Sequence, residues 1–206
     1  MRRNEGCPEY EIKDIYNYLF VFFNTEVTAQ DFDKGVDAHK SGDYITAFKE
    51  WLPLAEQGNY TLQYNIGIMH KIGQGVPVDI AESKKWLQLS AEQGYAPAQN
   101  SLGDILLYGR GVVNDYAKAT EWYRLAAEQN HDGAQKSLGA NYEYGLGVPQ
   151  NNVIAYMWYV IASLNGNQIA SDYRDKISDL MTTADISEAA KMARVCMNSG
   201  YKNCIR

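Results

Sequence analysis

Residues that could perform chemistry are few and scattered in this chain of 206 residues. The three histidines, His39, His70 and His131, are dispersed along the chain, and no His-Glu-x-x-His motif is present. Carboxylates are numerous, but no pair stands out from the solvated faces of the expected helices. Ser163 and Ser199 lack the strand-turn-helix setting that exposes a nucleophilic serine. The sequence therefore predicts no catalytic residue, no metal site and no cofactor.

Three Gly-x-Gly-Val segments admit two interpretations. They begin at Gly73, Gly109 and Gly145. A glycine-rich loop can cradle a phosphate group, but this requires a preceding buried strand and a further glycine that opens the next helix. Neither feature is present, whereas glycine in the left-handed conformation commonly ends a helix. We interpret the three segments as turns between helices.

These turns belong to a pattern that recurs every 36 residues. A fixed period of this length is typical of stacked repeat proteins, in which each helical unit buries its apolar face only against its neighbours. The landmarks that keep this spacing are Gly67, Gly103 and Gly139; Gly75, Gly111 and Gly147; Trp86, Trp122 and Trp158; and Gly58, Gly94, Asn130 and Gly166.

Each unit is predicted to contain two helices. In the first helix, Leu102 and Leu106 flank Gly103, which leaves one side apolar and flat enough for a close helix contact. Glycine in a helix interior costs about 1 kcal/mol relative to alanine, so its repetition at one register indicates close approach. The second helix is expected to begin at a capping residue. The capping residues are Asp79, Asp115 and Asn151, and the packing stripe that follows is Ala119, Trp122, Ala126 and Ala127.

Together these motifs resemble the Sel1-like repeat, a relative of the tetratricopeptide repeat with a slightly longer unit. The resemblance rests on Leu102-Gly103, Gly109 to Val112, Lys118 to Tyr123 and Ala126 to Gln129. It covers residues 31–166 and implies an all-α fold, a right-handed α-solenoid of about four helix pairs. Full units are expected at 59–94, 95–130 and 131–166, after a shortened first pair.

Three segments are expected along the chain: 1–29, the solenoid at 30–166, and 167–206. After residue 166 the period is lost. Two amphipathic helices, Ile169 to Met181 and Ile186 to Met197, are predicted there as a C-terminal cap on the exposed core.

The segment 1–29 has two interpretations. It begins Met1-Arg2-Arg3 and contains a short apolar run, Ile15 to Phe23, before the small residues that precede Gln30. This order is typical of a secretory signal peptide, with cleavage expected after Ala29 and a periplasmic or secreted location. The run is too short to span a bilayer. The alternative is an additional amphipathic helix on a cytoplasmic protein, because acidic residues separate the arginines from the apolar run.

The cysteines bear on the same question. Removal of the leader would remove Cys7 and leave Cys196 and Cys204, an even pair. A disulfide between them would tie the tail to the last helix, and such bonds persist in oxidising compartments. Similar tails occur in exported Sel1-like proteins. The alternative is two ordinary thiols; a structural zinc site would need four ligands.

A scaffold that binds a protein or peptide is the function expected from this architecture, because stacked helix pairs offer an extended concave face. Positions of the first helices that face away from Leu102 and Leu106 vary from unit to unit, as a binding face would. An exported enzyme, such as a hydrolase acting on cell-wall material, is the alternative. The expected partner-binding residues are Tyr64, Ile68, Lys71, Asn100, Asp104, Leu107, Lys136, Ala140 and Glu143.

Charge disfavours two classes of partner. The net charge is −6, and no block of lysine or arginine is present. Nucleic acids and anionic membranes are bound through basic patches that neutralise phosphates. We therefore expect a protein or peptide partner, no nucleic acid and no stable membrane span.

Overall fold

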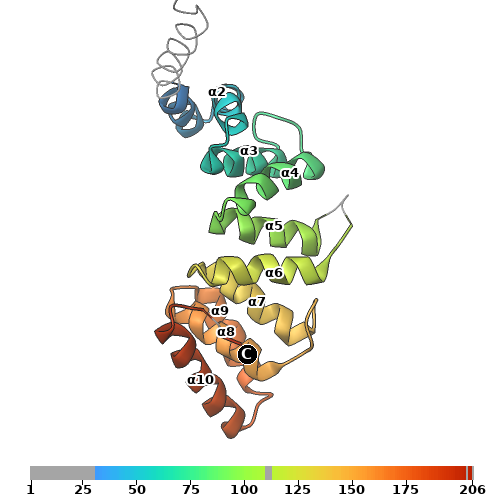
Figure 1. Ribbon diagram of the computed structural model, residues 1–206, viewed down its shortest axis with the longest axis vertical. Coiled ribbons are helices and arrows are strands. Elements are labelled where there is room, and N and C mark those ends of the chain that lie inside the picture. The colour runs from blue at the N-terminus through green and yellow to red at the C-terminus, as the bar shows by residue number, and fades with distance from the viewer. Residues whose placement is uncertain (1–30, 110–112, 203, 206) are drawn as a thin grey trace, which may run out of the picture.

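The computed structural model describes residues 31–109, 113–202, 204 and 205 (Figure 1). Within these ranges every regular element is helical. The expected leader with its cleavage site, and the residues 110–112 of the central turn, lie outside the described residues. The helices are residues 31–41, then α2 (Tyr44–Glu56), α3 (Tyr60–Ile72), α4 (Ile80–Glu92), α5 (Ala96–Tyr108), α6 (Tyr116–Ala127), α7 (Asp132–Tyr144), α8 (Asn152–Leu164), α9 (Gln168–Ser178) and α10 (Thr183–Asn198).

Consecutive helices pack in pairs, and the pairs stack along the long axis of the molecule (Figure 1). The closest packing joins α3 to α4, α5 to α6, and α7 to α8, and each pair then packs on the next. The predicted all-α solenoid is confirmed. No helix in the described part of the chain is both long and apolar enough to cross a membrane.

Periodic caps define the start of each second helix. The side chain of Asp79 accepts a hydrogen bond from the backbone N–H of Glu82, and Asp115 does the same for Lys118. Asn151 caps α8 in the same way. These contacts satisfy N–H groups that have no partner within the helix. The predicted caps are therefore confirmed.

The repeated glycines lie where the two helices of a pair touch. A Cβ atom on Gly103 would lie 2.6 Å from Cε1 of Tyr123, and one on Gly139 would lie 2.7 Å from Cδ1 of Tyr159. Such distances are shorter than carbon atoms tolerate, so only glycine permits this contact. In the unit before, Gly67 meets Leu87 in the same way. The close approach predicted from the glycine register is thus confirmed.

The first pair follows the same rule with a shorter connection. Gly35 lies under Trp51, and a Cβ there would be 2.3 Å from the indole Nε1. The two residues are 16 apart (51 − 35), whereas Gly67 and Leu87 are 20 apart (87 − 67). The first unit therefore lacks four residues between its helices, so its first helix is displaced by four residues from the period while α2 keeps it.

Buried glutamines join one unit to the next. Nε2 of Gln99 donates to the carbonyl of Ala91, and Oε1 of Gln99 accepts from Gln129 at 2.8 Å. Gln63 and Gln135 repeat this arrangement one unit earlier and one unit later. Because Gln99 is only 4% exposed, these bonds satisfy polar groups that would otherwise be buried without partners.

The C-terminal cap is present as predicted. Helix α9 packs against α8. Thr182 is the N-cap of α10: its hydroxyl accepts a hydrogen bond from the N–H of Asp185, and the carboxylate of Asp185 accepts one from the N–H of Thr182. This reciprocal capping box fixes the start of the helix. Helix α10 packs mainly on α8 rather than on α9. Its buried residues are Ala189, Ala193 and Cys196.

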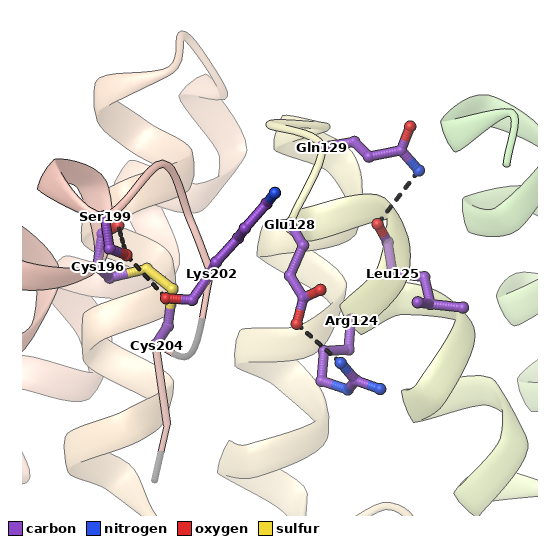
Figure 2. Close-up of polar contacts among 8 residues, drawn as sticks. All are labelled: Arg124, Leu125, Glu128, Gln129, Cys196, Ser199, Lys202 and Cys204. Carbon is purple, nitrogen blue, oxygen red and sulfur yellow. Dashed lines mark hydrogen bonds and ion pairs between the residues drawn. A yellow bond between two sulfur atoms is a disulfide. The ribbon is translucent and has the colours of Figure 1, made fainter.

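Cys196, near the end of α10, lies next to Cys204 of the tail (Figure 2). Their Sγ atoms are 1.95 Å apart, at the distance of a disulfide. Tyr201, Cys204 and Ile205 pack against the large hydrophobic cluster of the solenoid. The tail is therefore held against the stack both through Cys196 and by apolar contacts.

Candidate functional site

The predicted partner-binding residues occupy three registers of the first helices. We call the surface formed by these registers the first-helix face. Because the first helix of the first unit is displaced by four residues, its members there are Phe32, Val36 and His39. The registers are Phe32, Tyr64, Asn100 and Lys136; Val36, Ile68, Asp104 and Ala140; and His39, Lys71, Leu107 and Glu143.

The first-helix face carries a groove with a volume of about 470 Å³. It lies between the helix 31–41 and α3. Its walls include two predicted residues, Tyr64 and Ile68, and the equivalent Val36 of the first unit. The remaining lining residues are His39, Lys40, Trp51, Asn65, Met69 and Gln74. The groove is thus largely apolar and aromatic, with polar groups at its edge.

Aromatic contacts fix the shape of this groove. The His39 ring stacks on Trp51 with a centroid distance of 5.3 Å and meets Tyr44 edge-on at 5.2 Å. The indole Nε1 of Trp51 donates to the carbonyl of Phe32 at 3.4 Å. Tyr64 in turn contacts the ring of Tyr95 at 5.4 Å. Rings held in this way present a preformed surface to a ligand.

Two predicted residues form a polar link between units. Nζ of Lys71 lies 4.0 Å from Oδ2 of Asp104, so α3 and α5 are joined across the first-helix face. The hydroxyl of Tyr123 donates to Oδ1 of the same carboxylate at 2.8 Å. The buried Tyr123 therefore fixes one carboxylate oxygen of Asp104, and the other oxygen faces Lys71.

Glu143 is held in the same manner one unit later. Its Oε2 accepts a hydrogen bond from the hydroxyl of Tyr159 at 2.6 Å. Burial, together with the neighbouring carboxylates, raises the pKa of Tyr123 and Tyr159 far above the usual value. Both phenols consequently remain protonated donors, and the carboxylates keep fixed positions.

Exposed tyrosines surround these carboxylates. Tyr108 and Tyr144 are 68% and 60% exposed. Burial raises the pKa of Tyr108, and a hydrogen bond to Glu143 raises that of Tyr144. The phenol of Tyr173 lies close enough to add to both shifts. This part of the first-helix face is therefore aromatic and acidic, unlike the apolar groove.

The other predicted residues are placed differently. Leu107 is only 3% exposed and belongs to the hydrophobic core, so it does not reach the surface. Asn100, Lys136 and Ala140 are half-buried. The Oδ1 atom of Asn100 is buried and accepts no hydrogen bond within the described residues.

Sequence reasoning missed the first unit's share of the site. Val36, His39 and Trp51 line the groove; Val36 and His39 fall outside the 36-residue register because the first connection is shorter, whereas Trp51 keeps it as the equivalent of Leu87. Alignment of Gly35 with Gly67 would have revealed the displacement. Gln63, Gln99 and Gln135, with Gln93 and Gln129, also recur every 36 residues, and this signal was overlooked.

One serine has a lysine three residues later, a spacing that sequence analysis also missed. The hydroxyl of Ser199 lies 2.7 Å from the carbonyl oxygen of Cys196 and 2.8 Å from that of Lys202. Figure 2 shows the Lys202 side chain extending away from Ser199. The amine is thus not placed to activate the hydroxyl. In the described part of the chain, no group of His, Cys, Asp or Glu side chains could hold a metal ion.

The predicted cap-and-turn geometry and the stacked pairs agree with known proteins. The chain is 32% identical to a Sel1 repeat protein of Oxalobacter formigenes, with a TM-score of 0.62 over 68% of this chain and 56% of that one. It is 26% identical to a protective antigen of uropathogenic Escherichia coli with an SLR fold, with a TM-score of 0.52 over 86% of this chain and 47% of that one.

The chain thus spans about half the length of these two solved structures. No curated protein matches it. The Sel1 repeat model matches residues 62–95, 96–131 and 133–167, which are the three full units. The chain belongs to the Sel1 repeat family.

Proposed function

We propose that this protein is a non-enzymatic scaffold that holds a peptide or protein partner along the first-helix face, its concave side. Sel1 repeats generally mediate protein–protein interaction. The observation that carries the proposal is the groove between the helix 31–41 and α3, where Tyr64 and Ile68 meet Val36, Trp51 and the fixed ring of His39. Preformed aromatic pockets with polar edges are typical sites for anchor side chains.

The titratable groups of this face support binding over catalysis. The tyrosines whose pKa is perturbed here, such as Tyr108, Tyr144 and Tyr159, are all shifted upward. A general base would need a pKa near the working pH, whereas these phenols remain protonated. Tyr159 donates to Glu143, and Tyr123, whose pKa is also raised, donates to Asp104. A partner with an apolar anchor for the groove and polar groups for this region fits best.

We further propose export, with cleavage after Ala29 and a disulfide between Cys196 and Cys204. The pairing of Cys196 with Cys204 supports this proposal, because disulfides persist outside reducing compartments. The division into a leader at 1–29, a solenoid at 30–166 and a cap at 167–206 is part of the same proposal.

The binding proposal can be tested by selection from a displayed random-peptide library on the protein without residues 1–29. Selected peptides should bind in a saturable manner and lose about ten-fold in affinity with Ile68→Asn or Tyr64→Ser, since anchor contacts dominate such interfaces. Leu89→Ser, on the exposed side of α4, is the matched control and should leave affinity unchanged. Equal loss in all three variants, or in none, would contradict the proposal.

The hydrolase alternative has one specific residue pair to test, Ser199 and Lys202. Purified protein would be incubated with isolated cell-wall material, and release of soluble fragments would be followed. We expect no release above the level of a heat-denatured sample. Release that disappears with Ser199→Ala would favour the enzyme and contradict the scaffold.

A further inference from the structure

Helix α8 is packed on two different sides. Ala155, Tyr159 and Ala162 share a hydrophobic cluster with α9. Met157, Trp158 and Ile161 belong instead to the cluster that contains the buried stripe of α10. Since α10 packs on α8, this second side is a helix-binding surface that the chain itself fills.

The same side of α6 is not covered by any described helix. Subtraction of 36 from Met157, Trp158 and Ile161 gives Glu121, Trp122 and Leu125. These three residues of α6 line an open groove of about 640 Å³. Trp158 is 1% exposed under α10, whereas Trp122 remains half-buried. Trp122 and Trp158 thus occupy equivalent positions, but of these two helices only α8 is packed against α10.

The floor of this groove also corresponds to the covered site. Leu102 and Leu106 of α5 form the floor, and their equivalents on α7, Leu138 and Tyr142, lie in or against the cluster that α10 joins. The far wall comes from α4, with Lys84 and Gln88. The groove therefore has an apolar floor between two helices, as a docking site for a helix requires.

We propose that the groove between α4 and α6 docks an amphipathic helix of a partner protein, seated as α10 is seated on α8. The partner helix should carry small residues at positions i, i+4 and i+7, the spacing of Ala189, Ala193 and Cys196 in α10. Small side chains are needed because a large indole projects from the opposite helix. This site uses the second helices and stands independently of the first-helix face.

Charges at the rim specify the partner further. Lys118 is engaged with Asp115 at 3.1 Å, whereas Lys84 forms no ion pair with a described residue. Glu121 replaces the apolar Met157 of the covered site. An acidic side chain on the partner helix should therefore face Lys84, and a basic or polar one should face Glu121.

The experiment uses a fluorescein-labelled peptide with the sequence of residues 182–198, in which Cys196 is replaced by alanine. The peptide is titrated into the protein with its own α10 in place, and fluorescence anisotropy is recorded. We expect saturable binding that weakens about ten-fold with Trp122→Ala, as for a central aromatic contact. Glu121→Met, which gives α6 the residue of α8, should tighten binding about ten-fold because apolar area replaces a charge.

Ile45→Ser, at an exposed position of α2 outside the residues that line the groove, is the matched control and should leave peptide binding unchanged, and circular dichroism verifies that each variant is folded. Three outcomes overturn the proposal. Binding that persists unchanged in Trp122→Ala shows exchange with α10 on α8 instead. Absence of saturable binding to the Glu121→Met variant shows that the groove does not accept a helix. Self-association in sedimentation that requires Trp122 shows that a second copy of this chain is the occupant.

Discussion

The hydroxyl of Tyr123 donates to Oδ1 of Asp104 at 2.8 Å while the ring of the same tyrosine lies against Gly103. One residue of α6 thus makes both a close contact with the glycine of its partner helix and the polar contact that orients a side chain of the first-helix face. Tyr159 repeats this relationship with Gly139 and Glu143. Packing of the interior and placement of the surface carboxylates are therefore coupled.

Replacement of Gly103 by alanine should destabilise the protein by about 1–3 kcal/mol, because the new Cβ would overlap the buried Tyr123 ring. Urea unfolding followed by circular dichroism measures the change. Gly133→Ala in the first turn of α7 is the control. Its Cβ would lie 3.1 Å from the ring of His131, which caps α7 through Nδ1, and alanine favours helix, so the cost should be well below that of Gly103→Ala.

Tyr123→Phe should reduce the pH dependence of stability in alkaline solution. The folded pKa of Tyr123 is raised by burial and by Asp104, so the folded state keeps a proton that the unfolded state loses above about pH 10. The stabilisation present below that pH is therefore lost as pH rises. Unfolding free energies between pH 9 and 11 should fall less steeply in the variant, by up to about 1.4 kcal/mol per pH unit. An identical slope would contradict the assignment.

Loss of a glutamine link should weaken the stack. Gln99→Leu removes the donor to the carbonyl of Ala91 and the acceptor of Gln129. Leaving a buried polar group without a partner costs about 1–3 kcal/mol, and denaturant unfolding should show this loss. Gln88→Leu, whose amide bonds only to Glu92 at an exposed site, should cost far less, and equal costs would argue against the link.

The cysteine pair should stabilise the cap and report the compartment. Cys204→Ser should lower stability by about 2.5 kcal/mol, the loop-closure value for a separation of 8 residues. Intact mass of the protein recovered from its host without reductant should show loss of residues 1–29 and of two hydrogens. A full-length chain with both thiols reduced would defeat the export proposal.

Much of the fold was predictable from short-range patterns. Several landmark residues have local roles. Gly103 permits a close helix contact, Asp115 caps α6, and Asn130 adopts a left-handed turn conformation. Their types and spacing therefore indicated the helices directly. The period then supplied the stacking order. The partner of the glycine was missed, because Tyr123 lies next to the more conspicuous Trp122 and only the helix phase distinguishes the two.

Features that depend on distant contacts were not predictable. Trp158 is buried and Trp122 is not because α10 returns to cover α8, and nothing near either tryptophan indicates this. Leu107 shares a register with Lys71 and Glu143, yet its apolar side chain joins the core. The groove at Val36 and Trp51 depends on a connection shortened by four residues, which displaces the helix 31–41, but not α2, from the period.

The path of α10 has a consequence for how long such an array can become. In each full unit the second helix packs on the first helix of its own pair. Helix α10, which follows α9, packs mainly on α8 instead of on α9. Duplication of a whole helix pair upstream would leave the contact of α10 with α8 intact and lengthen the molecule by one unit. Because α10 returns to α8, the regular pairing of each helix with the next ends at α9, whereas a unit inserted upstream would keep that pairing.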